Sequence, residues 1–180
     1  MRLSLVVPAL VALAPAGALA VDYMSAEAAA KLLFAEADRF EARDWRLDAA
    51  QAQALAAQGL KPRSGPWRLR LAYRGSELLG VVVVDDVLGK FELISYAVGV
   101  GMDGLVRGVE ILAYRESHGH EVRMPAWRKQ FVGKTVGAPL KLGEDIANIS
   151  GATLSCGHVT EGVKRVVAVV DQARRSGALH

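Results

Sequence analysis

Two stretches in the first third of the chain, after an apolar N-terminus, have the composition and the end signals of helices. Residues 26–39 are rich in Ala, Glu and Leu, and Ser25 before them is a favoured N-cap residue, so a first helix is predicted there. Asp48 opens an Ala- and Gln-rich stretch that Gly59 ends, which predicts a second helix. A loop follows over residues 62–66, where Pro, Ser and Gly gather.

The middle of the chain changes to the period of a β-strand. Apolar residues occupy every second position from Trp67 to Tyr73, and three apolar or β-branched runs follow with short turns between them. Asp85, Asp86 and Gly89 are expected to form one of these turns. Aromatic residues on the strand patterns, Phe91 among them, are expected in the core. Short turns join antiparallel neighbours, so the pattern predicts a meander of strands over residues 67–73, 78–84, 91–100 and 105–114.

The last third returns to helical spacing. Residues 115–125 are irregular and polar, residues 126–132 fit a short helix, and residues 133–148 read as a loop. A final helix is predicted to begin near Cys156 or Gly157 and to turn a stripe of valines toward the core, at positions 159, 163, 166, 167 and 170. The predicted fold class is α+β, with an antiparallel β-sheet meander flanked by helices in a single domain.

Composition narrows the class of protein. The 180 residues carry 22 Lys and Arg against 19 Asp and Glu, a net charge of +3 without a basic run of five, which argues against a nucleic-acid binder. Cys156 is the single cysteine, so no intrachain disulfide can form. Cys156 itself fits either a reactive thiol at a helix N-terminus or a small buried residue.

The N-terminus has the pattern of a secretory signal peptide over residues 1–20. Arg2 precedes a short apolar core, and the stretch ends in Ala18-x-Ala20. An uncleaved N-terminal anchor is the alternative. Cleavage near Ala20 would leave residues 21–180 as the mature domain, in the periplasm or secreted.

One segment carries most of the chemical information, and it lies just before the final helix: Ser150-Gly151-Ala152-Thr153-Leu154-Ser155. Small residues and hydroxyls at a helix N-terminus suit a phosphate group, because backbone N–H groups and the positive end of the helix dipole meet there. Ordinary capping by Ser and Thr is the alternative. The segment lacks the lysine and spaced glycines of a Walker loop or a dinucleotide fingerprint.

These six residues resemble the [Ser/Thr]-Gly-Ala-[Ser/Thr]-x-[Ser/Thr] signal of the FMN-binding domain family. That family includes the flavin-carrying subunits of the sodium-pumping NADH:quinone oxidoreductase and of the Rnf complex. The resemblance implies covalent FMN, held by a phosphoester bond to Ser155 and installed from FAD by a flavin transferase. It also implies that Ser150, Gly151, Ala152 and Thr153 surround this group. The implied role is extracytoplasmic electron transfer from a membrane-bound redox partner, as a carrier or subunit rather than a stand-alone enzyme.

Two upstream blocks strengthen the resemblance. Residues 114–119 are similar to the family's Glu-Thr-x-Gly segment, which implies that Glu116, Ser117 and His118 border the isoalloxazine ring. Residues 127–134 are similar to its aromatic-x-x-Gln-Phe-x-Gly-Lys stretch, whose Trp127 and Phe131 could pack on the ring or pin the short helix to the sheet.

Two other features of the chain keep alternatives open. The family usually has an acid three residues before the first motif Ser, where this chain has Ala147, with Asp145 as the nearest acid. A binding module of the same fold without attached flavin is therefore the alternative. Ser155-Cys156-Gly157 is half of a nucleophile elbow, so a serine hydrolase using Ser155 is a third possibility, which needs a His and an acid in reach.

Two histidines and a glutamate lie close together in the polar stretch before the short helix. His118, His120 and Glu121 are an incomplete ligand set for a metal, and they are read as solvent-exposed loop residues. No metal site and no catalytic acid or base is predicted.

Overall fold

Six antiparallel strands form one sheet in the order β1-β6-β5-β4-β3-β2. The computed structural model describes residues 21–179, so the predicted signal peptide lies outside the described residues. The predicted meander and the α+β fold class are confirmed, because the last four strands pair consecutively. The strands are β1 (Val21–Asp22), β2 (Arg39–Trp45), β3 (Trp67–Arg74), β4 (Glu77–Leu88), β5 (Leu93–Gly101) and β6 (Val106–Tyr114).

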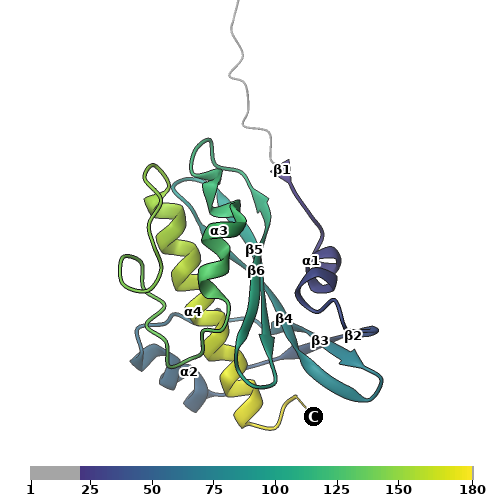
Figure 1. The fold of residues 1–180 in the computed structure, drawn as a ribbon. Coiled ribbons are helices and arrows are strands. Elements are labelled where there is room, and N and C mark those ends of the chain that lie inside the picture. The colour runs from purple at the N-terminus through teal and green to yellow at the C-terminus, as the bar shows by residue number, and fades with distance from the viewer. Residues whose placement is uncertain (1–20, 180) are drawn as a thin grey trace, which may run out of the picture.

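Helices cover both faces of the sheet (Figure 1). Helix α1 packs on one face, and the long α4 packs against β4 and β5 on the other. The smaller core lies under α1 around Phe34, and the larger one lies under α4 around Trp67 and Tyr96. Within the described residues, no helix has both the length and the apolar character to cross a bilayer. The helices are α1 (Ala26–Leu33), α2 (Ala49–Ala57), η1 (His120–Arg123), α3 (Pro125–Arg128), η2 (Lys129–Phe131) and α4 (Thr153–Arg175).

The two N-terminal helices begin where their caps predict. The Ser25 hydroxyl accepts a hydrogen bond from the Ala28 N–H at 3.1 Å, and Asp48 forms a reciprocal capping box with Gln51. Helix α1 ends at Leu33, however, so the prediction of helix to residue 39 is wrong at its end. Strand β2 follows and pairs with β3 along its whole length. Its many charged residues suit an exposed edge strand, which conceals the period of two.

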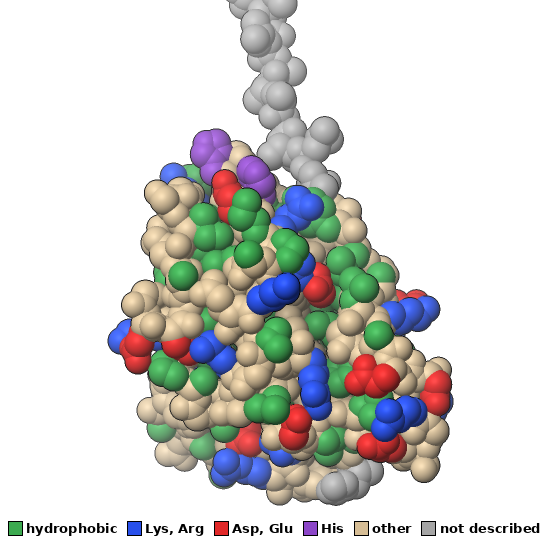
Figure 2. All heavy atoms as spheres, viewed as in Figure 1, with side chains coloured by type: hydrophobic (Ala, Val, Ile, Leu, Met, Phe, Trp, Pro, Cys, Tyr) green, Lys and Arg blue, Asp and Glu red, His purple; other side chains and the backbone are tan. Residues whose placement is uncertain are grey.

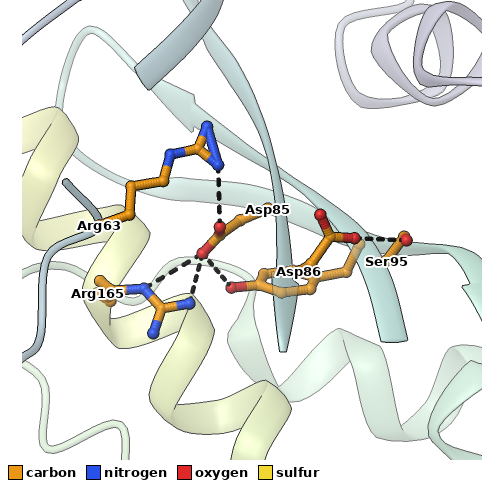
Figure 3. A network of polar contacts seen from close by, with 6 residues as sticks. Arg63, Asp85, Asp86, Ser95 and Arg165 are labelled. Carbon is orange, nitrogen blue, oxygen red and sulfur yellow. Dashed lines mark hydrogen bonds and ion pairs between the residues drawn. The ribbon is translucent and has the colours of Figure 1, made fainter. Parts of the chain in front are cut away.

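Asp85 and Asp86 lie inside β4, so the prediction of a turn at these residues is wrong. Asp85 is buried because two cations and a phenol satisfy it: Arg165 of α4 at 2.5 Å, Arg63 at 3.4 Å and the Tyr96 hydroxyl at 3.0 Å. Figure 3 shows both arginines converging on this carboxylate, while Asp86 turns to Ser95. The turn itself follows β4, at residues 89–92.

Helix α4 buries the predicted valine stripe completely against the sheet. Gly162 lets the helix approach β5, since a Cβ there would lie 2.2 Å from the Tyr96 hydroxyl. The helix begins at Thr153, three residues before the earliest predicted start. The reason is that Ala152 opens the helix without a side-chain cap, so the usual sequence signal is missing. The shift places Ser155 in the first turn of α4.

Candidate functional site

A cavity of about 520 Å³ opens where the N-terminus of α4 meets the β4–β5 turn and the segment after β6. Its volume lies in the range of small-molecule sites. The fold thus brings the two predicted ligand segments together, although Glu116 and Ser155 are far apart in sequence. Ser150 is exposed and does not line the cavity. The lining residues are Lys90, Phe91, Glu116, Ser117, His118, Gly151, Ala152, Thr153, Leu154 and Ser155.

A turn of four residues, 149–152, directly precedes α4. The Ala152 N–H donates to the Ile149 carbonyl at 3.0 Å, and Gly151 has a φ of +86° that suits glycine. No side chain caps the helix, so the hydroxyls of the motif do not serve as N-caps. The Thr153 hydroxyl instead accepts a hydrogen bond from the Asn148 amide at 2.9 Å. The first turn of α4, with its N–H groups and the positive end of the helix dipole, therefore reaches the cavity without a side-chain cap, since residues 153–155 line it.

Ser155 is almost completely buried, with 5% of its surface exposed, although it lines the cavity. Its Oγ lies 2.8 Å from the Tyr114 hydroxyl. Gly119 closes over this pair with a φ of +87°, and a Cβ there would lie 2.6 Å from the Tyr114 hydroxyl. Burial raises the pKa of Tyr114, and the hydrogen bond with Ser155 works in the opposite direction. Ser155 is therefore held in one place by the residues around it.

Glu116 holds the β4–β5 turn at the lip of the cavity. Its carboxylate accepts hydrogen bonds from the backbone N–H groups of Phe91 at 2.5 Å and Glu92 at 2.9 Å. Gly89 makes room for it, since a Cβ there would lie 2.5 Å from the carboxylate. Burial favours a higher pKa for Glu116, but these N–H groups and the Lys90 charge outweigh it, and the pKa lies below its usual value.

The aromatic block of residues 127–134 contacts the loop that precedes the motif of residues 150–155. Trp127 and Phe131 are buried, with ring centroids 5.1 Å apart in an edge-to-face arrangement, and neither lines the cavity. Trp127 Nε1 donates to the Ala147 carbonyl, and the Gln130 side chain accepts from the Ala147 N–H. Of the two readings, these contacts fit the second, in which the block pins the short helix to the sheet, since α3 and η2 contact β6. The block also holds the loop that leads to the motif.

One protein-family model matches the part of the chain that forms the cavity. Residues 89–168 match the model of the FMN-binding domain. This segment runs from the β4–β5 turn into α4 and contains every residue that lines the cavity. The resemblance read from the motifs is confirmed over these residues, and the match supports FMN as the cofactor.

Two solved structures resemble the chain. One is NqrC of Shewanella oneidensis, with 18% identity, a TM-score of 0.48, and coverage of 78% of this chain and 73% of that one. The other is a Na⁺-translocating NADH-quinone reductase subunit of Parabacteroides distasonis, with 13% identity, a TM-score of 0.47, and coverage of 82% and 80%. No curated protein sequence matches the chain.

Three cavity residues of the FMN-binding domain segment were not predicted as site residues: Lys90, Phe91 and Leu154. Phe91 is 73% exposed, so its expected place in the core is wrong. It lies in the turn before β5, not in the strand itself. Leu154 is 51% exposed on the opposite wall. The sequence contained a signal for the exposed position of Phe91. Phe91 follows Gly89-Lys90 directly, and a glycine there indicates that the turn continues to Phe91 before the strand begins.

The positions of the side chains give little support to three other readings of the sequence: a serine hydrolase, a metal site and a reactive Cys156. Among residues 21–179, Tyr114 is the hydrogen-bond partner of the Ser155 hydroxyl, and no histidine side chain bonds to it, as a serine hydrolase requires. The described part of the chain holds no cluster of three or more metal-ligating side chains. Cys156 is fully buried, and burial raises the pKa of its thiol, which fits a packing role.

Proposed function

We propose that this protein is an electron-transfer flavoprotein that carries FMN covalently, through a phosphoester bond between the FMN phosphate and Ser155 Oγ. One observation carries the proposal: the last hydroxyl of the motif lies in the first turn of a long helix and lines a cavity of about 520 Å³. In the matched family model, this segment is part of an FMN-binding domain.

The cavity residues suit the two ends of FMN. The N-terminus of α4 supplies uncapped N–H groups near Ser155, which favour a phosphate. Phe91 and Leu154 supply apolar surface further out, which favours a planar ring. Bound FMN would supply the redox chemistry. The protein would supply position, exclusion of water and a covalent tether that prevents loss of the flavin outside the cytoplasm.

The proposal includes a location and two partners. We infer a periplasmic or secreted mature domain of residues 21–180, after signal peptide cleavage near Ala20. A flavin transferase would attach FMN, and a membrane-bound redox protein would supply the electrons. The protein would act as a carrier or subunit rather than as a stand-alone enzyme.

A binding module without attached flavin is the second candidate, and Ala147 favours it. The acid usual at this position is absent, and Asp145 does not replace it. The Asp145 carboxylate pairs with Lys134 at 2.8 Å and accepts hydrogen bonds from the Leu140 and Lys141 N–H groups. Asp145 is thus occupied in folding the loop and does not line the cavity.

Co-expression with a flavin transferase tests the proposal. We expect a mass gain of one FMN less water and flavin fluorescence that persists in a denaturing gel. Ser155→Ala should lose both, whereas Ser95→Ala, which removes a hydroxyl of β5 that bonds Asp86 outside the cavity, should keep both. Absence of modification with an active transferase would favour the binding module. Labelling of Ser155 by a fluorophosphonate probe would favour the hydrolase.

A further inference from the structure

The Tyr114 hydroxyl lies between two oxygen atoms, and only one assignment of protons satisfies both contacts. Tyr114 has a single hydroxyl proton, and the carbonyl oxygen of His118 can only accept. Tyr114 therefore donates to His118. The second contact, 2.8 Å from Ser155 Oγ, must then have Ser155 as the donor. The proton of the Ser155 hydroxyl points at Tyr114, and the lone pairs of Oγ remain for the cavity.

A β-bulge aims Tyr114 at Ser155. Along β6, Val109 and Ile111 belong to the larger core, on the face of the sheet that α4 covers, so strict alternation would place Ala113 on that face and turn Tyr114 away. The pairing of β6 with β5 instead shifts by one residue, from Tyr96↔Ile111 to Ser95↔Ala113. The extra residue exchanges the faces beyond it, and Tyr114 joins the core under α4.

The segment after β6 fixes the other side of Tyr114. Gly119 turns the chain with a positive φ and leaves no space for a side chain over the two hydroxyls. Glu116 ties the same segment to the β4–β5 turn. The His118 carbonyl is therefore held where it accepts the hydrogen bond from the Tyr114 hydroxyl, which fixes the direction of both hydrogen bonds.

We propose that Tyr114 is the positioning residue for the modification of Ser155, an inference that rests on the proposed function. In the transfer, Ser155 Oγ forms a bond to the FMN phosphorus of FAD, and the P–O bond to the AMP portion breaks. AMP leaves, and the hydroxyl proton passes to a base of the transferase or to solvent. Tyr114 holds Oγ in the rotamer whose lone pairs face the phosphorus.

The experiment compares Tyr114→Phe with Tyr96→Phe in a flavinylation assay with purified flavin transferase and FAD. Both variants lose one buried tyrosine hydroxyl under α4, but that of Tyr96 bonds Asp85, away from the cavity. For Tyr114→Phe we expect the maximal rate to fall about tenfold, because the one hydrogen bond that holds Ser155 Oγ in the reactive rotamer is lost. The half-saturating concentration of the acceptor protein should stay unchanged. Tyr96→Phe should keep the wild-type rate.

Three results would overturn the inference: equal maximal rates for Tyr114→Phe and wild type, a Tyr114→Phe effect confined to the half-saturating concentration, or an equal loss of rate in Tyr96→Phe. A wild-type protein that stays unmodified would refute the proposed function instead. The hydrogen bond can then still be tested by titrating tyrosine absorbance. Ser155→Ala should raise the pKa of Tyr114 further, because burial remains and the donor to its oxygen is lost. An unchanged pKa would refute the contact.

Discussion

Asp85 of β4, which is buried, and Arg165 of α4, which is half-buried, form an ion pair at 2.5 Å. This pair fixes α4, the helix that carries Ser155, to the sheet. The guanidinium contacts one carboxylate oxygen through two nitrogens, and Tyr96 donates to that same oxygen. Arg63 reaches the other oxygen from the loop before β3. Because three elements converge on one carboxylate, this contact links the position of α4 to the rest of the fold.

Asp85→Asn should therefore destabilise the protein strongly. The amide keeps the size of the side chain but leaves the half-buried Arg165 without its counter-charge, and we expect a loss of about 2–4 kcal/mol in the free energy of unfolding. Asp86→Asn is the matched control, since Asp86 is exposed and, within residues 21–179, bonds only the Ser95 hydroxyl. Urea denaturation followed by circular dichroism measures both. Equal unfolding midpoints for Asp85→Asn and wild type would contradict the assigned role.

Glu116→Gln should flatten the dependence of stability on pH in acid. The pKa of Glu116 is lowered in the folded protein, so its contribution to stability is complete above its ordinary pKa, 4.5, and disappears as the pH falls through the lower folded value. Thermal midpoints measured from pH 3 to pH 7 should show a smaller drop below about pH 4.5 in this variant. Parallel curves for Glu116→Gln and wild type would refute this function of the carboxylate.

The strongly periodic elements were predictable from sequence, and the exceptions have physical reasons. The valine stripe of α4 and the alternation in β3 each follow one period, so their pattern shows the buried face. Strands β4 and β5 were predictable as continuous apolar runs instead, because helices cover both faces of the sheet. Strand β2 lies at an edge where charged residues face solvent, which hides its period. Asp85 was predicted in a turn because a charged residue is unusual inside a buried strand. It is stable within β4 because Arg165, far along the chain, supplies the opposite charge.

The composition of the site was partly predictable as well. The motif and the Glu116 segment identified most of the cavity, because family motifs mark residues near a ligand. The bulge in β6 and the exposed position of Phe91 depend on strand pairing, which local sequence does not specify. Charged residues of both signs are dispersed over the face in Figure 2, which agrees with the modest net charge and gives no further guide to the site.

Gly119→Ala should destabilise the protein more than an alanine at another glycine of similar conformation. Both Gly119 and Gly133 have a positive φ, +87° and +78°, so alanine is strained at either position. At Gly119 the new Cβ would also meet the Tyr114 hydroxyl at 2.6 Å, whereas no atom of the described residues lies within 4 Å of a Cβ at Gly133. We expect Gly133→Ala to cost about 1 kcal/mol and Gly119→Ala about 2–3 kcal/mol. Thermal unfolding of the two variants would show equal losses if the closure over Tyr114 and Ser155 were loose.

Phe91→Ala tests whether the exposed aromatic at the cavity lip contacts the flavin. Phe91 is 73% exposed, so its removal should change the free energy of unfolding by less than about 0.5 kcal/mol. If its ring packs on the isoalloxazine, the variant should expose the flavin to solvent, with faster quenching of flavin fluorescence by iodide. Leu93→Ala is the matched control, because Leu93 is 47% exposed on the adjoining strand and does not line the cavity.

Identical quenching constants for wild type, Phe91→Ala and Leu93→Ala would place the isoalloxazine ring elsewhere, against Leu154 and the N-terminus of α4. A selective increase in Phe91→Ala would identify the β4–β5 turn as the outer wall of the flavin site, held in place by Glu116.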